Sequence, residues 1–241
     1  MLIAIISDIH GNLEAFQKVI DHMEAQQPEK VICLGDLIGY GPDPDEVVRL
    51  FRYKGYLSVL GNHEAALQNR RMRNWLNFPA RENSIETEKL LSRESFDFCC
   101  GLPETITVEN ALFVHGFPPA SVLRSVTMAS DSDLKNYFKS TNTDLCFVGH
   151  THELLIFCWD GKSLRRESLD QDTYQLHRQH KYIINTGSVG QPRDGSNSAK
   201  YILWDTVRHR LEIIRIKYDY RSTARKIQKR GFSEAFGRRL L

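Results

Sequence analysis

No stretch of this 241-residue chain is both long and apolar. The hydrophobic runs, such as residues 2–6, fall far short of the ~20 apolar residues that a membrane-spanning helix needs. The sequence reaches Asp8 before the apolar core of a signal peptide could form. Cysteines are few: there are five, an odd number, without zinc-motif spacing. We therefore expect a cytoplasmic protein with reduced thiols and no membrane partner.

The chain also lacks an excess of either charge. Lys and Arg number 32 against 30 for Asp and Glu, so the net charge is +2 and the molecule as a whole is not an electrostatic binder of nucleic acid. Only residues 221–241 are strongly basic, with seven basic residues and one acidic residue. A solvated terminal helix explains this segment more simply than an arm that contacts phosphate, and both interpretations stay open.

What the sequence does have is a short apolar run that recurs and ends each time on polar residues. Six such runs, rich in Ile, Val, Leu and Phe, begin at positions 2, 30, 56, 111, 145 and 182. They do not alternate between apolar and polar residues, which is typical of strands buried on both faces of a sheet. Helical spacing over residues 13–23, with Asn12 as N-cap and Pro28 as stop, predicts a helix between the first two runs.

The second half of the chain has a different pattern. After residue 152 the helical patterns stop, and apolar runs follow one another across short turns, which predicts an antiparallel meander. Residues 65–105 are charged and helix-prone, and they predict a helical insertion beside the strand ends. These halves together predict one α/β domain over residues 1–241, a four-layer α-β-β-α sandwich with helices on both outer faces.

The residues that carry chemistry come directly after these runs. In open α/β sheets, sites form outside the carboxyl ends of the strands. Those ends hold Asp8, His10, Asp36, Asn62, His63, His115, His150 and His152, which include five of the nine histidines. A single histidine there is more often a satisfied polar residue than a ligand, but a set of this size is hard to attribute to chance. Oxygen and imidazole donors without thiolate suit divalent Mn, Fe, Zn, Co or Ni.

In chain order these residues form five short motifs. They are Asp8-Ile9-His10, Gly35-Asp36, Gly61-Asn62-His63-Glu64, His115-Gly116 and Gly149-His150-Thr151-His152. The ordered set resembles the motifs of the calcineurin-like metallophosphoesterases. Residues 39–44, the insertion and residues 185–194 are similar to the small bacterial and archaeal phosphodiesterase branch of that superfamily. The resemblance covers nearly the whole chain and implies the same sandwich fold.

The resemblance implies a centre of two divalent ions bridged by Asp36, with Mn²⁺ as the expected metal and Fe, Zn, Co or Ni as alternatives. The other ligands would divide into two sets, with Asp8, His10 and His152 on one ion and Asn62, His115 and His150 on the other. Two cations about 3.5–4 Å apart clamp a phosphate and lower the pKa of a bridging water. The implied reaction is hydrolysis of a phosphodiester by attack of a metal-bridging hydroxide.

Some candidate residues lie outside this ligand set. His63 faces the leaving oxygen in the family's motif, so it is the expected general acid, and with Asp36 it makes up the catalytic pair. A structural histidine is the alternative. Gly187 and Ser188 let backbone amides approach an anion, and Arg193 can bind phosphate through two hydrogen bonds. An ordinary turn with a surface arginine explains these three residues equally well.

The substrate follows from two missing arginines. Phosphoprotein phosphatases of the superfamily clamp phosphate with arginines at positions that hold Tyr40 and Leu60 here. Without this pair a doubly charged monoester loses its bidentate partner, so we expect a small phosphodiester or nucleotide-like substrate, with Tyr40 as a stacking surface. A phosphomonoesterase or protein phosphatase, a nuclease acting on nucleic acid and a non-catalytic scaffold of the same fold are the alternatives, and a homo-oligomer stays open.

Overall fold

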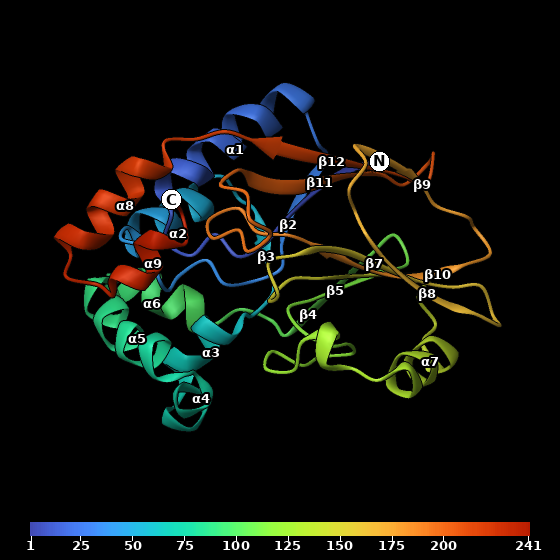
Figure 1. Cartoon of the computed structure of the whole chain (residues 1–241), viewed down its shortest axis with the longest axis horizontal. Coiled ribbons are helices and arrows are strands. Elements are labelled where there is room, and N and C mark those ends of the chain that lie inside the picture. Colours follow the sequence, from blue (N-terminus) through green and yellow to red (C-terminus); the bar gives the residue numbers. More distant parts are fainter.

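The computed structural model describes residues 1–241 and arranges them around two six-stranded sheets that pack face to face (Figure 1). The first sheet has the order β3-β2-β1-β11-β12-β9. Its strands are β1 (Leu2–Ile6), β2 (Lys30–Cys33), β3 (Leu57–Ser58), β9 (Thr173–Gln175), β11 (Ala199–Asp205) and β12 (Arg210–Ile216). The second has the order β4-β5-β6-β10-β7-β8. Its strands are β4 (Thr105–Val108), β5 (Ala111–Val114), β6 (Leu145–Val148), β7 (Leu154–Trp159), β8 (Leu164–Ser168) and β10 (Lys181–Thr186).

Helices cover both outer faces. On the first sheet lies α1 (Leu13–Gln26), with α2 (Pro44–Tyr53) and α8 (Tyr220–Lys229) packed beside it. On the second sheet lies α7 (Asp131–Ser140), preceded by a short 3-10 helix (Val126–Met128). The α-β-β-α sandwich predicted from the sequence is confirmed. None of the helices combines the length and the apolar character that a membrane span requires.

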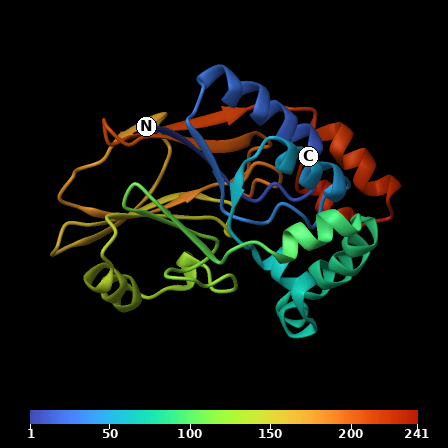
Figure 2. The ribbon, with the colours of Figure 1, turned by 180° about the vertical axis from the view of Figure 1, so that it is seen from behind.

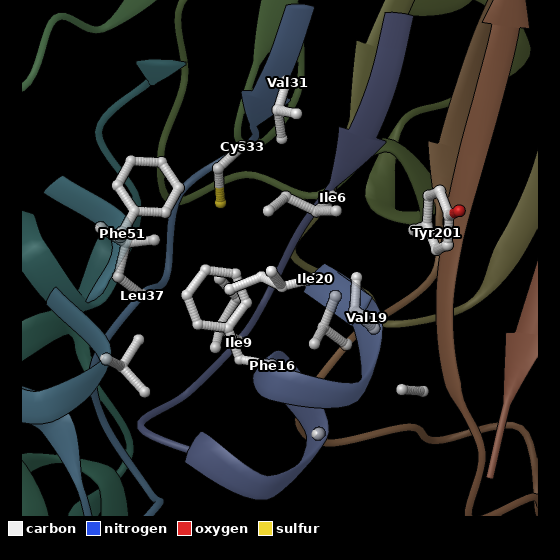
Figure 3. Close-up of a cluster of buried hydrophobic side chains, with 14 of the residues drawn as sticks. Ile6, Ile9, Phe16, Val19, Ile20, Val31, Cys33, Leu37, Phe51 and Tyr201 are labelled. Atoms are coloured by element: carbon white, nitrogen blue, oxygen red, sulfur yellow. The ribbon is translucent and has the colours of Figure 1, made fainter. Parts of the chain in front are cut away.

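Three hydrophobic clusters separate the four layers. The cluster between α1 and the first sheet contains 22 buried residues, and Figure 3 shows Phe16, Val19 and Ile20 of α1 beside Ile6 of β1. The cluster between the sheets contains 19 residues and the cluster under α7 contains 11. The helix predicted after Asn12 is confirmed, because the Asn12 side chain accepts a hydrogen bond from the Ala15 amide at 3.1 Å and caps α1.

The segment predicted as a helical insertion is helical. It contains α3 (Asn62–Gln68), α4 (Arg70–Trp75), α5 (Phe78–Leu90) and α6 (Arg93–Cys100). Seen from both sides, these helices gather at the same end of the sandwich as α8 and α9 (Glu234–Arg238) (Figures 1 and 2). Helices from segments far apart in the sequence therefore pack together at one end of the two sheets.

The single antiparallel meander predicted after residue 152 is wrong. Strands β7 and β10 belong to the second sheet, where β10 pairs in parallel with β6 and antiparallel with β7. Strand β11 crosses to the first sheet and pairs antiparallel with β1, and β12 follows it. Buried runs of this kind fit a central position in either sheet, so the run alone does not specify its partner. Helices also return after β12, as α8 and α9.

Candidate metal centre

The predicted ligands lie in the loops after β1, β2, β5 and β6 and at the start of α3, and the fold brings them together. Five of them have a left-handed backbone that non-glycine residues adopt only rarely: Asp8, His10, Asp36, His150 and His152, with φ between 51° and 70°. Backbone hydrogen bonds fix two of these loops side by side, from the Asp8 amide to the Gly35 carbonyl (3.1 Å) and from the His10 amide to the Asp36 carbonyl (2.9 Å). The loops hold these strained conformations so that the side chains turn inward.

Asp8, His10 and His152 form the first donor group. Asp8 Oδ1 lies 3.2 Å from His152 Nε2 and 3.6 Å from His10 Nε2, and the two Nε2 atoms are 3.1 Å apart. Nδ1 of His10 contacts the Ile38 carbonyl at 3.0 Å, and Nδ1 of His152 contacts the Gln191 carbonyl. Carbonyls only accept, so Nδ1 carries the proton and both Nε2 lone pairs face inward. Asp8 Oδ1 is buried without a hydrogen-bond partner, as a site for a cation requires.

Asn62, His115 and His150 form the second donor group. Asn62 Oδ1 lies 2.9 Å from His115 Nε2 and 2.7 Å from His150 Nδ1, and these two nitrogens are 3.1 Å apart. The Leu34 carbonyl, 2.7 Å from His115 Nδ1, fixes that ring in the same way as in the first group. His150 differs, because it turns Nδ1 inward.

Asp36 lies between the two groups. Its Oδ2 atom is 3.8 Å from His10 Nε2 and 3.4 Å from His115 Nε2, while Oδ1 accepts the His63 amide at 3.0 Å. Ligand atoms of Asp36, His115 and His150 lie within 4.8 Å of one another, as do those of the first group. One carboxylate oxygen therefore faces both groups, and the donor set fits divalent cations.

Burial sets the protonation of these side chains. It lowers the pKa of His10 to about 4 and that of His150 to about 3, and it also lowers the pKa of His115. Burial likewise raises the pKa of Asp36, with the charges of Glu64 and Asp8 adding to the effect. For Asp8, burial is outweighed by His152 and His10, so its pKa is well below the ordinary value. Neutral imidazoles beside a carboxylate are the state that binds a metal ion.

His63 is enclosed next to this centre. It is 2% exposed, its Nδ1 atom has no hydrogen-bond partner, and its ring centroid is 4.5 Å from that of Tyr40 and 5.0 Å from that of His10. Burial lowers the pKa of His63 well below its usual range. The Nδ1 atom of His63 therefore remains available to form a hydrogen bond with a group that enters the site.

Glu64 has a role that the sequence did not indicate. Its carboxylate accepts the amides of Asp36 (2.9 Å), Gly61 (3.1 Å) and Ile38 (3.2 Å). It thereby holds the loop that carries Asp36 against the start of α3. Its position directly after two predicted site residues, Asn62 and His63, was the available signal for such a supporting role.

A cavity of about 400 Å³ opens above the centre. Among the residues that line it are Asp36, His63, Tyr40, Trp75, Arg193 and Arg239. Tyr40 and Arg193 were predicted to contact substrate, whereas Arg239 was not singled out.

Gly187 and Ser188 lie below the cavity. The Ser188 hydroxyl donates to the Asp8 carbonyl and accepts from the Gln191 amide, both at 2.8 Å, and Gly187 packs against Leu154. These contacts hold the loop after β10 and leave neither residue facing the cavity.

Comparisons with known proteins agree with this geometry. Residues 1–209 match the calcineurin-like phosphoesterase superfamily domain. An uncharacterized protein of Methanocaldococcus jannaschii is 36% identical over 247 residues, which cover 99% of this chain and 97% of that protein. A metallophosphoesterase from Sphaerobacter thermophilus superposes with a TM-score of 0.86 at 33% identity, covering 100% of this chain and 98% of that one.

A novel archaeal phosphodiesterase, 18% identical, shares the fold with a TM-score of 0.50, covering 90% of this chain and 100% of that one. The match over most of the chain and the two relatives above 30% identity determine the family. The chain belongs to the calcineurin-like phosphoesterase superfamily, whose members are metal-dependent hydrolases of phosphoester bonds.

Proposed function

We propose that this protein is a dinuclear-metal-dependent phosphodiesterase that acts on small, nucleotide-like diesters. The observation that carries the proposal is the position of Asp36 Oδ2, which faces His10 at 3.8 Å and His115 at 3.4 Å on the floor of an open cavity. Two divalent ions bound there would neutralise charge on a phosphoryl group and supply a water of lowered pKa. Mn²⁺ is the metal we expect.

The protein's own residues orient the substrate and handle the proton of the leaving group. His63 lines the cavity and has a free Nδ1 atom, so it can donate a proton to the leaving oxygen. Burial holds its pKa low, because it disfavours the cation. An anionic phosphate in the cavity would raise that pKa again, which makes the acid available when substrate is bound.

The preference for diesters rests on the two positions where phosphoprotein phosphatases carry arginine. Tyr40 presents an aromatic ring at the cavity, and Leu60 is buried in an apolar cluster with Ala65 and Val122. Neither position places a cation beside the metal ligands, which favours a phosphate with a single charge. The insertion and Arg239, just after α9, also border the cavity, which favours a small substrate over a long polymer.

The test compares bis(4-nitrophenyl) phosphate with 4-nitrophenyl phosphate after the protein has been loaded with Mn²⁺. These substrates share a leaving group and differ in the charge of the phosphate. We expect the diester to have the higher kcat/KM and chelation to abolish its hydrolysis. A preference for the monoester would contradict the substrate assignment, and activity unaffected by chelation would contradict the metal.

A further inference from the structure

Two arginines meet above the metal centre and have no acidic partner. Arg193, in the loop after β10, places a guanidinium nitrogen 3.4 Å from Gln191 Oε1, and Arg239, just after α9, places one 3.4 Å from the same oxygen. Neighbouring carboxylates are engaged elsewhere, since Asp194 pairs with Lys200 at 2.9 Å and Glu234 with Arg238 at 2.9 Å. Two like charges that share one amide oxygen repel each other unless an anion joins them.

The segment that carries Arg239 is packed firmly against the protein, although the Arg239 side chain itself is exposed. On either side of it, Phe236 is 2% exposed and Leu240 is 1% exposed. The Phe236 ring lies 4.9 Å from the ring of Tyr40, and Lys226 of α8 binds Asp43 at 2.7 Å and Glu14 at 2.6 Å. The basic segment 221–241 is therefore packed on the body of the protein, and it delivers one arginine to the cavity.

The positions of the two arginines relative to the centre differ. Arg193 lies near enough for its charge to influence the pKa values of His10, Asp36 and His150 as well as that of Tyr40, whereas Arg239 influences the pKa of Tyr40. Gln191 joins the two places, because its carbonyl contacts His152 Nδ1 while its side chain contacts both arginines. An anion between the guanidinium groups would lie beside the reacting phosphate and not on the metal ligands.

We propose that Arg193, Arg239 and Gln191 form a subsite for a second phosphate of the substrate. The substrate is then a phosphodiester that carries a further phosphoryl group, such as a nucleoside bisphosphate ester. This inference rests on the proposed function for the bond that is cleaved, but binding of an anion at the subsite does not require the metal ligands. Each guanidinium supplies charge-assisted hydrogen bonds to phosphate oxygens, the strongest kind available to it.

Direct binding tests the subsite without catalysis. Inorganic pyrophosphate is titrated calorimetrically into chelated protein at low salt, for wild type, R239Q, R193Q and the control R238Q. We expect R239Q and R193Q to weaken binding about tenfold to a hundredfold, as expected for a lost charge-assisted hydrogen bond, and R238Q to bind like wild type. No binding by wild type, or equal binding by R239Q and wild type, would overturn the subsite. Equal weakening in R238Q would reduce the effect to net charge and overturn it too.

Kinetics test the second phosphate. The 5′-(4-nitrophenyl phosphate) of thymidine is compared with the same ester bearing a 3′-phosphate, so the scissile bond and leaving group are identical. We expect wild type to prefer the bisphosphate in kcat/KM, and R239Q to lose most of that preference through KM. If R239Q lowers kcat equally on both esters, the arginines clamp the scissile phosphate and the proposal is wrong. If pyrophosphate binds as expected but neither ester is cleaved, only the proposed function fails.

Discussion

The two donor groups that share Asp36 are built differently. In the first group Asp8, His10 and His152 are at most 1% exposed, and both histidines turn Nε2 inward with Nδ1 fixed by a backbone carbonyl. The second group has the neutral amide of Asn62 in place of a carboxylate, and His150 is partly exposed, turns Nδ1 inward and lines the cavity.

The two groups differ in the charge of their ligands and in their exposure to the cavity, and both differences affect how tightly each group should hold a metal ion. An ion in the first group would have the Asp8 carboxylate to itself and would border the cavity only through the buried His152. An ion in the second group would draw negative charge only from the shared Asp36 and would face the cavity. Affinity for a divalent cation rises with the negative charge and rigidity of its ligands, so the first group should hold its ion more tightly and the second should exchange.

The largest expected effect comes from Asp36→Asn, which removes the charge that both groups share. We expect kcat/KM for the nitrophenyl diester to fall about a thousandfold or more, because several kcal/mol of charge stabilisation is lost. Elemental analysis should show that both ions are depleted. The exposed Asp21, in an ion pair with Lys18, gives the control Asp21→Asn. Full occupancy of one group in Asp36→Asn would show that the groups do not share the carboxylate.

The next prediction concerns His63→Ala, since His63 lies beside both donor groups without belonging to either. We expect metal content to be unchanged and hydrolysis of a nucleoside or alkyl diester to fall about 10²–10⁴-fold, the usual contribution of a general acid. The nitrophenyl diester should lose far less, because its leaving group needs little protonation. Steady-state rates on the two diesters measure this difference, and equal losses would leave His63 a positioning role only.

A matched pair of glycine variants compares the two groups directly. After dialysis, His150→Gly should retain about one ion per chain, in the intact first group. His152→Gly should retain less, because only the weaker group remains. We expect the metal affinities of the two variants to differ about tenfold to a hundredfold, as for other changes in the surroundings of a metal. Equal metal retention would mean that burial and the Asp8 carboxylate do not distinguish the groups.

Much of the site could be predicted because strand ends converge. Asp8, Asp36 and His115 each follow a buried run, and parallel strands bring their carboxyl ends to one edge. The sheet partner of β11 could not be predicted, since its buried run fits either sheet. Arg239 could not be predicted as a cavity residue either, because its position depends on how α8 and α9 pack against Tyr40 some 200 residues earlier in the chain.

The left-handed backbone of the ligand loops has a practical consequence for alanine scanning. Glycine, asparagine, aspartate and histidine tolerate this conformation far better than alanine, and holding a residue there costs about 1–3 kcal/mol. An alanine at position 8, 10, 36, 150 or 152 would therefore change the folding equilibrium and the ligand set at once. Substitutions by glycine or asparagine separate the two effects, and they are the informative way to map this centre.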